Sequence, residues 1–247
     1  MIDVAASDMM VFRAVAGMCV GAVVGSFAAT AALRMARGRD PIKGRSQCDG
    51  CARQLGWAET VPFVGYAVAR GQCRCGSRID RFHMAGETLG GLALVIPLVL
   101  LPGVSAIVTG LLCLLLLVSA LIDLKTLRLP DLLTVAIAVC ALILAALSGH
   151  VVSGVIAAVA AAAVLYGLKL WLERRHARPM LGLGDIKLVA ALALWLGLRT
   201  PAMIALAAIL GLALVLIQKR KDAIPFGPMI AAGAFIVGVL VPEGWLI

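Results

Sequence analysis

Two aspartates, Asp123 and Asp185, stand at the edges of long apolar stretches of this 247-residue chain. Asp123 ends one apolar run, and Asp185 follows the glycines Gly182 and Gly184 at the start of another. An ionisable side chain at membrane depth is costly and therefore usually functional. Two carboxylates on distant segments that meet on one side of a bilayer are the minimum set for acid–base chemistry on a membrane-embedded substrate.

Two pairs of cysteines form a second group of reactive side chains. Two residues separate Cys48 from Cys51, one residue separates Cys73 from Cys75, and 21 residues separate the pairs. Four thiolates on two short turns can complete a closed tetrahedral zinc site, and a reducing compartment favours metal binding over disulfides. Such a site would be structural. Free or redox-active thiols are the alternative, because zinc turns usually have spacers of two or more residues.

Membrane-spanning helices are the elements that must position these residues. The chain is 62% hydrophobic and 14% charged, whereas about 25% of a typical soluble protein is charged. Because a span needs about 20 mostly apolar residues, we predict an all-α polytopic membrane protein with about eight transmembrane helices. The predicted spans are 12–33, 84–101, 104–122, 131–148, 151–172, 186–198, 201–217 and 224–241. The short sixth span is expected to begin within the stretch from Gly182 to Asp185.

A polar insert separates the first two predicted helices. We therefore divide the chain into a first transmembrane helix (1–33), a small cytoplasmic zinc-binding insert rich in cysteine (34–83) and a membrane-embedded domain (84–247). The insert is too short to hold a good hydrophobic core alone, which favours a metal staple. In the first helix, Gly17, Gly21 and Gly25 recur every four residues, a pattern that lets membrane helices pack closely.

The net charge of +9 could indicate nucleic-acid binding, but its distribution indicates membrane topology instead. If the insert is cytoplasmic, every Lys and Arg except Arg13 and Arg199 falls in the loops on that side. The positive-inside rule explains this asymmetry without a polyanion. We expect the lipid bilayer and no nucleic acid as a partner. Eight spans then place both termini outside and both Asp123 and Asp185 at the cytoplasmic face.

The two aspartates differ from a third carboxylate nearby, Asp131. Asp131 follows Pro130 and is expected to begin a helix, where the helix dipole favours a negative charge. Asp123 stands at a helix C-terminus, where a negative charge is unfavourable. Two facing carboxylates cannot easily both ionise and therefore titrate as a unit. Such a pair can activate water against a peptide carbonyl, as in aspartic proteases.

Five short motifs, in order along nearly the whole chain, resemble those of the type IV prepilin peptidases, which are Gly-x-Gly-Asp membrane aspartic proteases. They are Gly25-Ser26-Phe27, the segment from Arg45 to Gly76 with its four cysteines, Asp123 with Leu129-Pro130-Asp131, Gly182 to Leu188, and Ile224-Pro225-Phe226-Gly227-Pro228.

The resemblance implies an aspartic endopeptidase of the bacterial inner membrane, multi-pass and with its active site facing the cytoplasm. It would remove the basic leader of type IV prepilins or type II secretion pseudopilins and, with S-adenosylmethionine as donor, methylate the new N-terminus. It would make Asp123 and Asp185 the catalytic pair and the cysteines zinc ligands. It also implies supporting roles for Gly182, Gly184, Lys187 and Glu87, with Glu87 tied to methyl transfer or substrate handling.

Two positions depart from the family's pattern. Ala29 stands where an Asn is usual, and the second cysteine pair is one residue short. Both departures fall in the region linked to methyl transfer, so they bear on that activity more than on proteolysis. No glycine-rich fingerprint locates a site for the methyl donor.

Two functions of other classes remain open on the residues alone. A transporter could use the two aspartates to bind a cation or relay protons, but it predicts carboxylates near the middle of the bilayer. A membrane scaffold built on a zinc ribbon explains the cysteines and leaves Gly184-Asp185 without a role.

Overall fold

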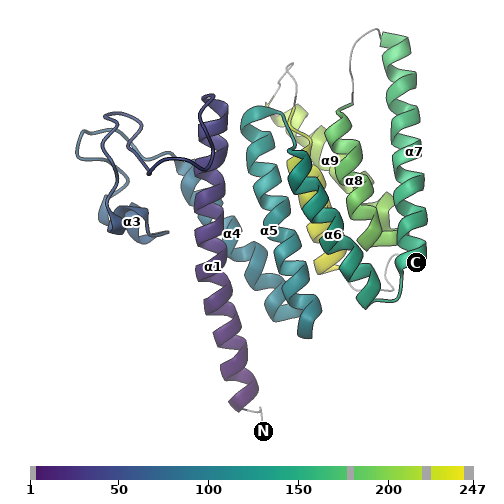
Figure 1. Cartoon of the computed structure of the whole chain (residues 1–247), viewed down its shortest axis with the longest axis horizontal. Coiled ribbons are helices and arrows are strands. Elements are labelled where there is room, and N and C mark those ends of the chain that lie inside the picture. Colours follow the sequence, from purple (N-terminus) through teal and green to yellow (C-terminus); the bar gives the residue numbers. More distant parts are fainter. Residues whose placement is uncertain (1–3, 177–180, 219–223, 242–247) are drawn as a thin grey trace.

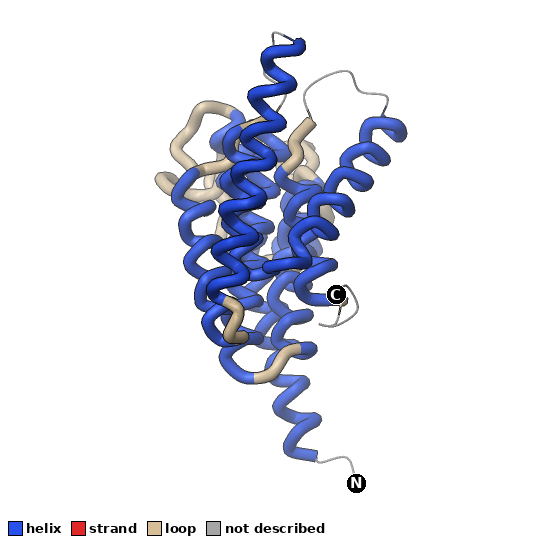
Figure 2. Tube along the Cα trace, turned by 90° about the vertical axis from the view of Figure 1, so that its right-hand side faces the viewer, coloured by secondary structure: helices blue, strands red, loops and turns tan. Residues whose placement is uncertain are grey.

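The computed structural model describes residues 4–176, 181–218 and 224–241, and this part of the chain consists of helices joined by loops. The long helix α1 (Val4–Ala36) precedes the insert, which contains the short helices α2 (Trp57–Thr60) and α3 (Val64–Val68). The following helices are α4 (Arg81–Leu100), α5 (Gly103–Thr126), α6 (Asp131–Leu147), α7 (Val151–His176), α8 (Leu183–Leu196), α9 (Thr200–Gln218) and α10 (Gly227–Phe235). The helices stand side by side in a bundle with the insert on one flank (Figures 1 and 2).

Five stretches of the described chain are long and apolar enough to cross a membrane. They are Ser7–Ala36, Arg81–Leu100, Gly103–Thr126, Val151–Arg175 and Leu183–Ile217. Asp131–Leu147 and Gly227–Leu240 are shorter apolar helices. The chain is therefore an all-helical membrane protein, while eight separate crossings remain a prediction.

The sixth and seventh predicted spans fall within one apolar stretch that is interrupted once. A short turn, η1 (Gly197–Arg199), separates α8 from α9, and Gly197 has φ 52° and ψ −124°, a conformation that suits glycine. Helix α8 begins at Leu183, within the stretch where its start was expected. Another short helical segment, η2 (Ile236–Leu240), extends α10.

The glycine face of α1 packs directly against a second glycine face on α4. A Cβ atom on Gly21 would lie 2.1 Å from the carbonyl oxygen of Gly90, and one on Gly25 would lie 1.9 Å from that of Gly86. The two backbones are thus in contact, which only small residues permit. Ala29, the residue that departs from the family pattern, is fully buried in the same seam and faces Gly86.

The largest hydrophobic core lies among α5, α6, α8, α9 and α10. Its fully buried side chains include Leu112, Ile137, Leu192, Met203 and Ile230. A smaller cluster joins Ala28 and Ala32 of α1 to Leu121 and Ile122 of α5. This second cluster ends one residue before Asp123, so packing fixes the helix on which that carboxylate stands.

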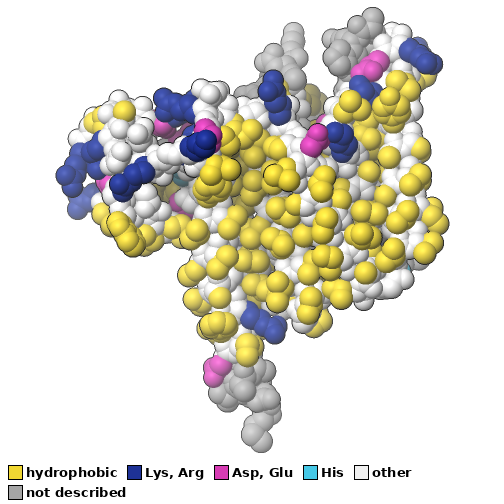
Figure 3. All heavy atoms as spheres, in the orientation of Figure 1, with side chains coloured by type: hydrophobic (Ala, Val, Ile, Leu, Met, Phe, Trp, Pro, Cys, Tyr) yellow, Lys and Arg dark blue, Asp and Glu magenta, His cyan; other side chains and the backbone are white. Residues whose placement is uncertain are grey.

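Charged side chains gather at one end of the bundle and on the insert, and the sides of the helices are almost wholly hydrophobic (Figure 3). This separation is what a membrane requires. Arg178, Lys219, Arg220 and Lys221, which the topology prediction places at the charged end, lie outside the described residues. The assignment of that end to the cytoplasm remains a prediction.

The backbone contact between α1 and α4 predicts that Gly21→Ala destabilises the fold. The added methyl group meets backbone atoms that cannot turn aside, and such overpacking costs about 1–3 kcal/mol. Thermal unfolding of the purified protein in detergent measures the loss. Gly167→Ala in α7 is the control, because a Cβ there meets nothing within 4 Å and Ala favours helix by about 1 kcal/mol. Equal stability of the two variants would contradict the tight seam.

Candidate active site

Asp123 is a buried carboxylate held by a backbone amide from a distant helix. It lies in the last turn of α5 with 5% of its surface exposed, and its Oδ2 accepts a hydrogen bond from the backbone N of Gly227 at 2.9 Å. Gly227 begins α10, and backbone N–H groups in the first turn of a helix lack partners within the helix. The start of α10 therefore satisfies a negative charge that α5 alone would leave unpaired.

Gly227 is a site residue whose role the sequence did not reveal. A Cβ atom at this position would lie 2.8 Å from Asp123 Oδ2, so any larger residue would push the carboxylate away. The motif from Ile224 to Pro228 is matched in the sequence, but its contact with Asp123 spans 104 residues. One local signal was present in the sequence: Pro228 favours the first turn of a helix, which places Gly227 at a helix start.

Asp185 stands in the first turn of α8, and two glycines make room for it. A Cβ atom on Gly182 would lie 2.8 Å from Asp185 Oδ2, so the carboxylate occupies the space that a larger residue would take. A Cβ on Gly184 would lie 3.1 Å from Cβ of Leu129, in the loop that follows Asp123. The glycines thus let the start of α8 pack closely against that loop.

The two carboxylates approach the same region from different helices. Asp185 lines a small cavity of about 30 Å³ together with Phe226, the residue before the Gly227 that binds Asp123. Asp123 does not line this cavity, and the segment Phe226–Gly227 is what connects the two carboxylates. A cavity of roughly 10–15 Å³ is enough for one water, so this cavity has room for one beside Asp185, its only polar lining residue. Two carboxylates and a water are the components of aspartic proteolysis.

Lys187 and Asp131 form an ion pair beside this region. Lys187 Nζ lies 2.7 Å from Asp131 Oδ1, and 53% and 74% of their side chains are exposed. Asp131 is in the first turn of α6, as its sequence predicted. Exposed pairs contribute about 0–1 kcal/mol, so this one links the starts of α6 and α8 and contributes little stability.

The four insert cysteines come together despite the one-residue spacer. Their sulfur atoms all lie within 4.8 Å of one another, with Cys48 Sγ 3.7 Å from Cys75 Sγ and Cys51 Sγ 4.0 Å from Cys73 Sγ. Zinc–sulfur bonds of about 2.3 Å in a tetrahedron place sulfurs about 3.8 Å apart. These separations fit a zinc ion and are far longer than a disulfide bond of about 2.0 Å.

Arg53 connects the cysteine cluster to the rest of the insert. Its Nη2 lies 3.8 Å from Cys73 Sγ, and the same guanidinium donates to both carboxylate oxygens of Glu59 at 2.6 and 3.1 Å. Hydrogen bonds from the Cys75 backbone, the Cys48 side chain and Arg53 lower the pKa of Cys73 to about 6. Those from Arg53 and Gly56 lower the pKa of Glu59 to about 2. Cys73 therefore favours the thiolate form that metals bind, whereas the pKa of Cys75 is raised to about 11.

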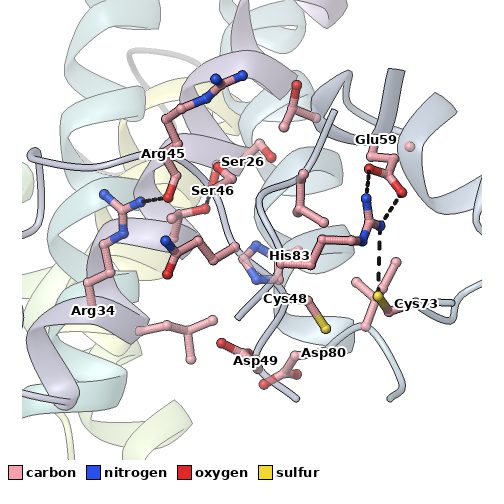
Figure 4. Close-up of a pocket in the computed structure, with 18 of the residues that line it drawn as sticks. Ser26, Arg34, Arg45, Ser46, Cys48, Asp49, Glu59, Cys73, Asp80 and His83 are labelled. Atoms are coloured by element: carbon pink, nitrogen blue, oxygen red, sulfur yellow. Dashed lines mark hydrogen bonds and ion pairs between the residues drawn. The ribbon is translucent and has the colours of Figure 1, made fainter. Parts of the chain in front are cut away.

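Glu87 lies at a second, larger pocket and not at the carboxylate pair. The pocket, of about 360 Å³, lies between α1, α4 and the insert (Figure 4). Glu87 is buried; its Oε1 accepts from Ser26 Oγ at 2.9 Å and its Oε2 from the backbone N of Phe63 at 2.8 Å. Neither Asp123 nor Asp185 lines this pocket.

Figure 4 shows how the insert and α1 enclose the pocket. His83 lies near its centre, Cys48 and Cys73 lie toward one side, and Arg34 lies on the opposite side. The guanidinium of Arg34 donates to the backbone oxygens of Pro41, Lys43, Gly44 and Arg45 at 3.0–3.5 Å. One α1 side chain thereby fixes the loop that closes this wall.

Sequence comparisons relate both halves of the chain to known proteins. The bacterial peptidase A24 N-terminal domain matches residues 19–101, and the type IV leader peptidase family matches residues 110–217. A prepilin leader peptidase/N-methyltransferase of Aeromonas salmonicida is 32% identical over 203 residues, which are 78% of this chain and 70% of the relative. One of Burkholderia pseudomallei is 34% identical over 206 residues, 76% and 65% of the two chains. No solved structure matches significantly.

The resemblance seen in the short motifs is therefore confirmed over most of the chain. Asp123 and Asp185 fall within the second matched region, and the cysteine cluster falls within the first. The chain belongs to the family of prepilin leader peptidases.

Proposed function

We propose that the chain is a membrane-embedded aspartic endopeptidase that removes the leader peptide of prepilins or pseudopilins, with Asp123 and Asp185 as its catalytic pair. The observation that carries this proposal is that one short segment connects the two carboxylates: the backbone N of Gly227 donates to Asp123 of α5, and the preceding Phe226 lines a small cavity with Asp185 of α8.

The reaction follows from two carboxyl groups that share one proton. The ionised carboxylate takes a proton from a water molecule, whose oxygen attacks the carbonyl carbon of the scissile peptide bond. The protonated carboxyl donates to the carbonyl oxygen; collapse of the tetrahedral intermediate breaks the C–N bond, and a proton passes to the leaving amine. Because Gly227 occupies Oδ2 of Asp123, Oδ1 is the oxygen left for the water.

The topology supports cleavage at the cytoplasmic side of a bacterial inner membrane. Asp123 and Asp185 stand at the end of the bundle where basic side chains gather (Figure 3), and basic residues favour the cytoplasmic side. The supporting residues then have distinct parts. Gly182 and Gly184 make room for Asp185 and its helix, and the Lys187–Asp131 pair holds two helix starts together.

We further propose that the pocket around Glu87 is where methyl transfer to the new N-terminus takes place. The donor, S-adenosylmethionine, combines a carboxylate, an amine, a ribose and an adenine ring, and supplies the methyl group as a sulfonium. The pocket offers matching groups in a volume typical of small-molecule sites: His83 as a donor, Ser26 and Glu87 as polar partners, and the positive charge of Arg34, whose Nη atoms bind the loop backbone. Ala29 does not line it. The two reactions would thus occupy separate sites in one chain.

Replacement of either catalytic carboxylate is expected to stop leader removal. Asp123→Asn and Asp185→Asn keep the shape of the side chain but cannot act as base or acid, which typically costs about 10²–10⁴ in rate. Mass spectrometry of a leader-bearing prepilin after incubation with purified protein in lipid measures cleavage. Asp8→Asn, at an exposed carboxylate of α1 outside the site, is the matched control and should cleave within a few-fold of the wild type. Undiminished cleavage by both catalytic variants would refute the assignment.

Removal of the charge of Glu87 is expected to separate the two activities. In Glu87→Gln the amide oxygen can still accept from the Phe63 backbone N while the amide NH₂ faces Ser26, so the insert stays docked. We expect at least a tenfold loss of methyl transfer with leader cleavage changed less than threefold, both read as product masses. Thr88→Ala, at the exposed neighbour, should change neither. Parallel loss of both activities, or a wild type that never methylates, would contradict this part of the proposal.

The cysteine cluster is expected to hold one zinc ion per chain as a structural staple. Metal analysis of the purified protein should find that ion, and Cys48→Ser or Cys75→Ser should lose it and expose residues 34–83 to protease, since the metal's binding energy stabilises such a segment. Cys19→Ser, at an exposed cysteine of α1, should retain the metal. Absence of metal in protein purified without chelators would favour free thiols instead.

A further inference from the structure

Helices α2 and α3 present large hydrophobic side chains that no described part of the chain covers. The side chains of Trp57 and Val68 are 82% and 64% exposed, and Val61, Phe63 and Val64 are exposed beside them. We call these five residues the α2–α3 face. An exposed apolar patch on a small polar module marks an interaction surface. Of the five residues, only Val61 also lines the Glu87 pocket.

The insert lies beside the membrane helices and not on their ends. The backbone N of Phe63 donates to Glu87 Oε2, and Glu87 Oε1 accepts from Ser26. Ser26 is ten residues before the end of α1 at Ala36, which is about 15 Å along a helix at 1.5 Å per residue. The α2–α3 face is therefore level with the body of α1, as the position of α3 along α1 in Figure 1 also shows.

The opposite edge of the insert stays close to the end of α1. The loop of residues 41–45 is bound by the guanidinium of Arg34, two residues before the end of that helix. Ile42 in this loop is also apolar and 73% exposed. The insert thus reaches from the end of α1 down to the level of Ser26, and only its lower edge carries the α2–α3 face.

The apolar helix α4 puts this level near the edge of a bilayer, because Glu87 lies six residues after its start at Arg81, which is about 9 Å along the helix. Helix α1 has 33 residues, hence a length of about 50 Å, against an apolar membrane core of about 30 Å. Part of α1 must therefore lie outside the core. Figure 3 shows hydrophobic side chains along the lower edge of the insert, continuing into the apolar sides of the helices, with Lys and Arg on its outer side. Arg70, Arg74 and Arg78 are exposed residues of this segment.

We propose that the α2–α3 face lies in the bilayer itself, at the boundary between headgroups and acyl chains, so that the insert is an interfacial element and not a free cytoplasmic module. Trp and other apolar side chains favour this boundary, and nearby arginines favour anionic phosphates. The occupant of the face is phospholipid. This inference stands on geometry and holds whether or not the chain cleaves prepilins.

Photocrosslinking in lipid tests this placement. The full chain carries benzoylphenylalanine at position 64, or at position 42 as a more exposed control, and is reconstituted in vesicles of phosphatidylethanolamine and phosphatidylglycerol. Mass spectrometry after irradiation should find lipid adducts at position 64 at least fivefold more often than at position 42. The proposal would be overturned by equal yields of lipid adducts at the two positions, or by crosslinks from position 64 to protein only.

A second measurement needs no unnatural residue in the insert. Brominated phospholipids quench tryptophans that contact acyl chains, and the difference between wild type and Trp57→Phe isolates Trp57 from the other tryptophans. We expect the part of the emission lost on Trp57→Phe substitution to be quenched more than twofold by lipids brominated near the headgroup. Emission from Trp57 that the brominated lipids leave unchanged would overturn the proposal.

Discussion

The hydrogen bond from the Gly227 backbone N to Asp123 Oδ2 is the contact on which the proposed catalytic centre depends. A carboxylate buried at the end of a membrane helix finds little water, and the C-terminal dipole of its own helix disfavours its charge. The first turn of another helix offers free N–H groups and the opposite dipole. Joining the end of α5 to the start of α10 therefore satisfies the carboxylate and fixes its direction at once.

Space for the carboxylates comes from residues that have no side chain. A Cβ atom on Gly227 would lie 2.8 Å from the Asp123 carboxylate, and one on Gly182 would lie 2.8 Å from the Asp185 carboxylate. A Cβ atom on Gly184 would lie 3.1 Å from Cβ of Leu129. The same device joins α1 to α4 at Gly21 and Gly90, where it supports the second pocket instead. In a membrane, where apolar burial does not drive helices together, close backbone approach is a main source of affinity. Both proposed sites are thus built at glycine seams.

Much of this arrangement follows from local sequence. Apolar runs predicted the helices, four-residue glycine spacing predicted the α1 seam, and an aspartate at a helix C-terminus indicated the candidate site. Gly227 as the partner of Asp123, and Phe63 as the partner of Glu87, could not be predicted, because each contact joins backbone to side chain across distant segments. The one-residue cysteine spacer was also misleading: the turns around it still bring four sulfurs together, because Cys73 and Ser77 close their own loop.

The central claim is that Asp123 and Asp185 act together on one reacting centre. The most direct measurement compares the affinities of two leader-spanning peptides whose scissile amide is replaced by a hydroxyl-bearing carbon or by a plain methylene. A hydroxyl that mimics the tetrahedral intermediate should bind between the carboxylates, and such mimics bind at least about 10²-fold more tightly than ground-state analogues. The account predicts that gain in the wild type and its loss in both Asp123→Asn and Asp185→Asn. A gain that survives either substitution would show that the carboxylates do not share a centre.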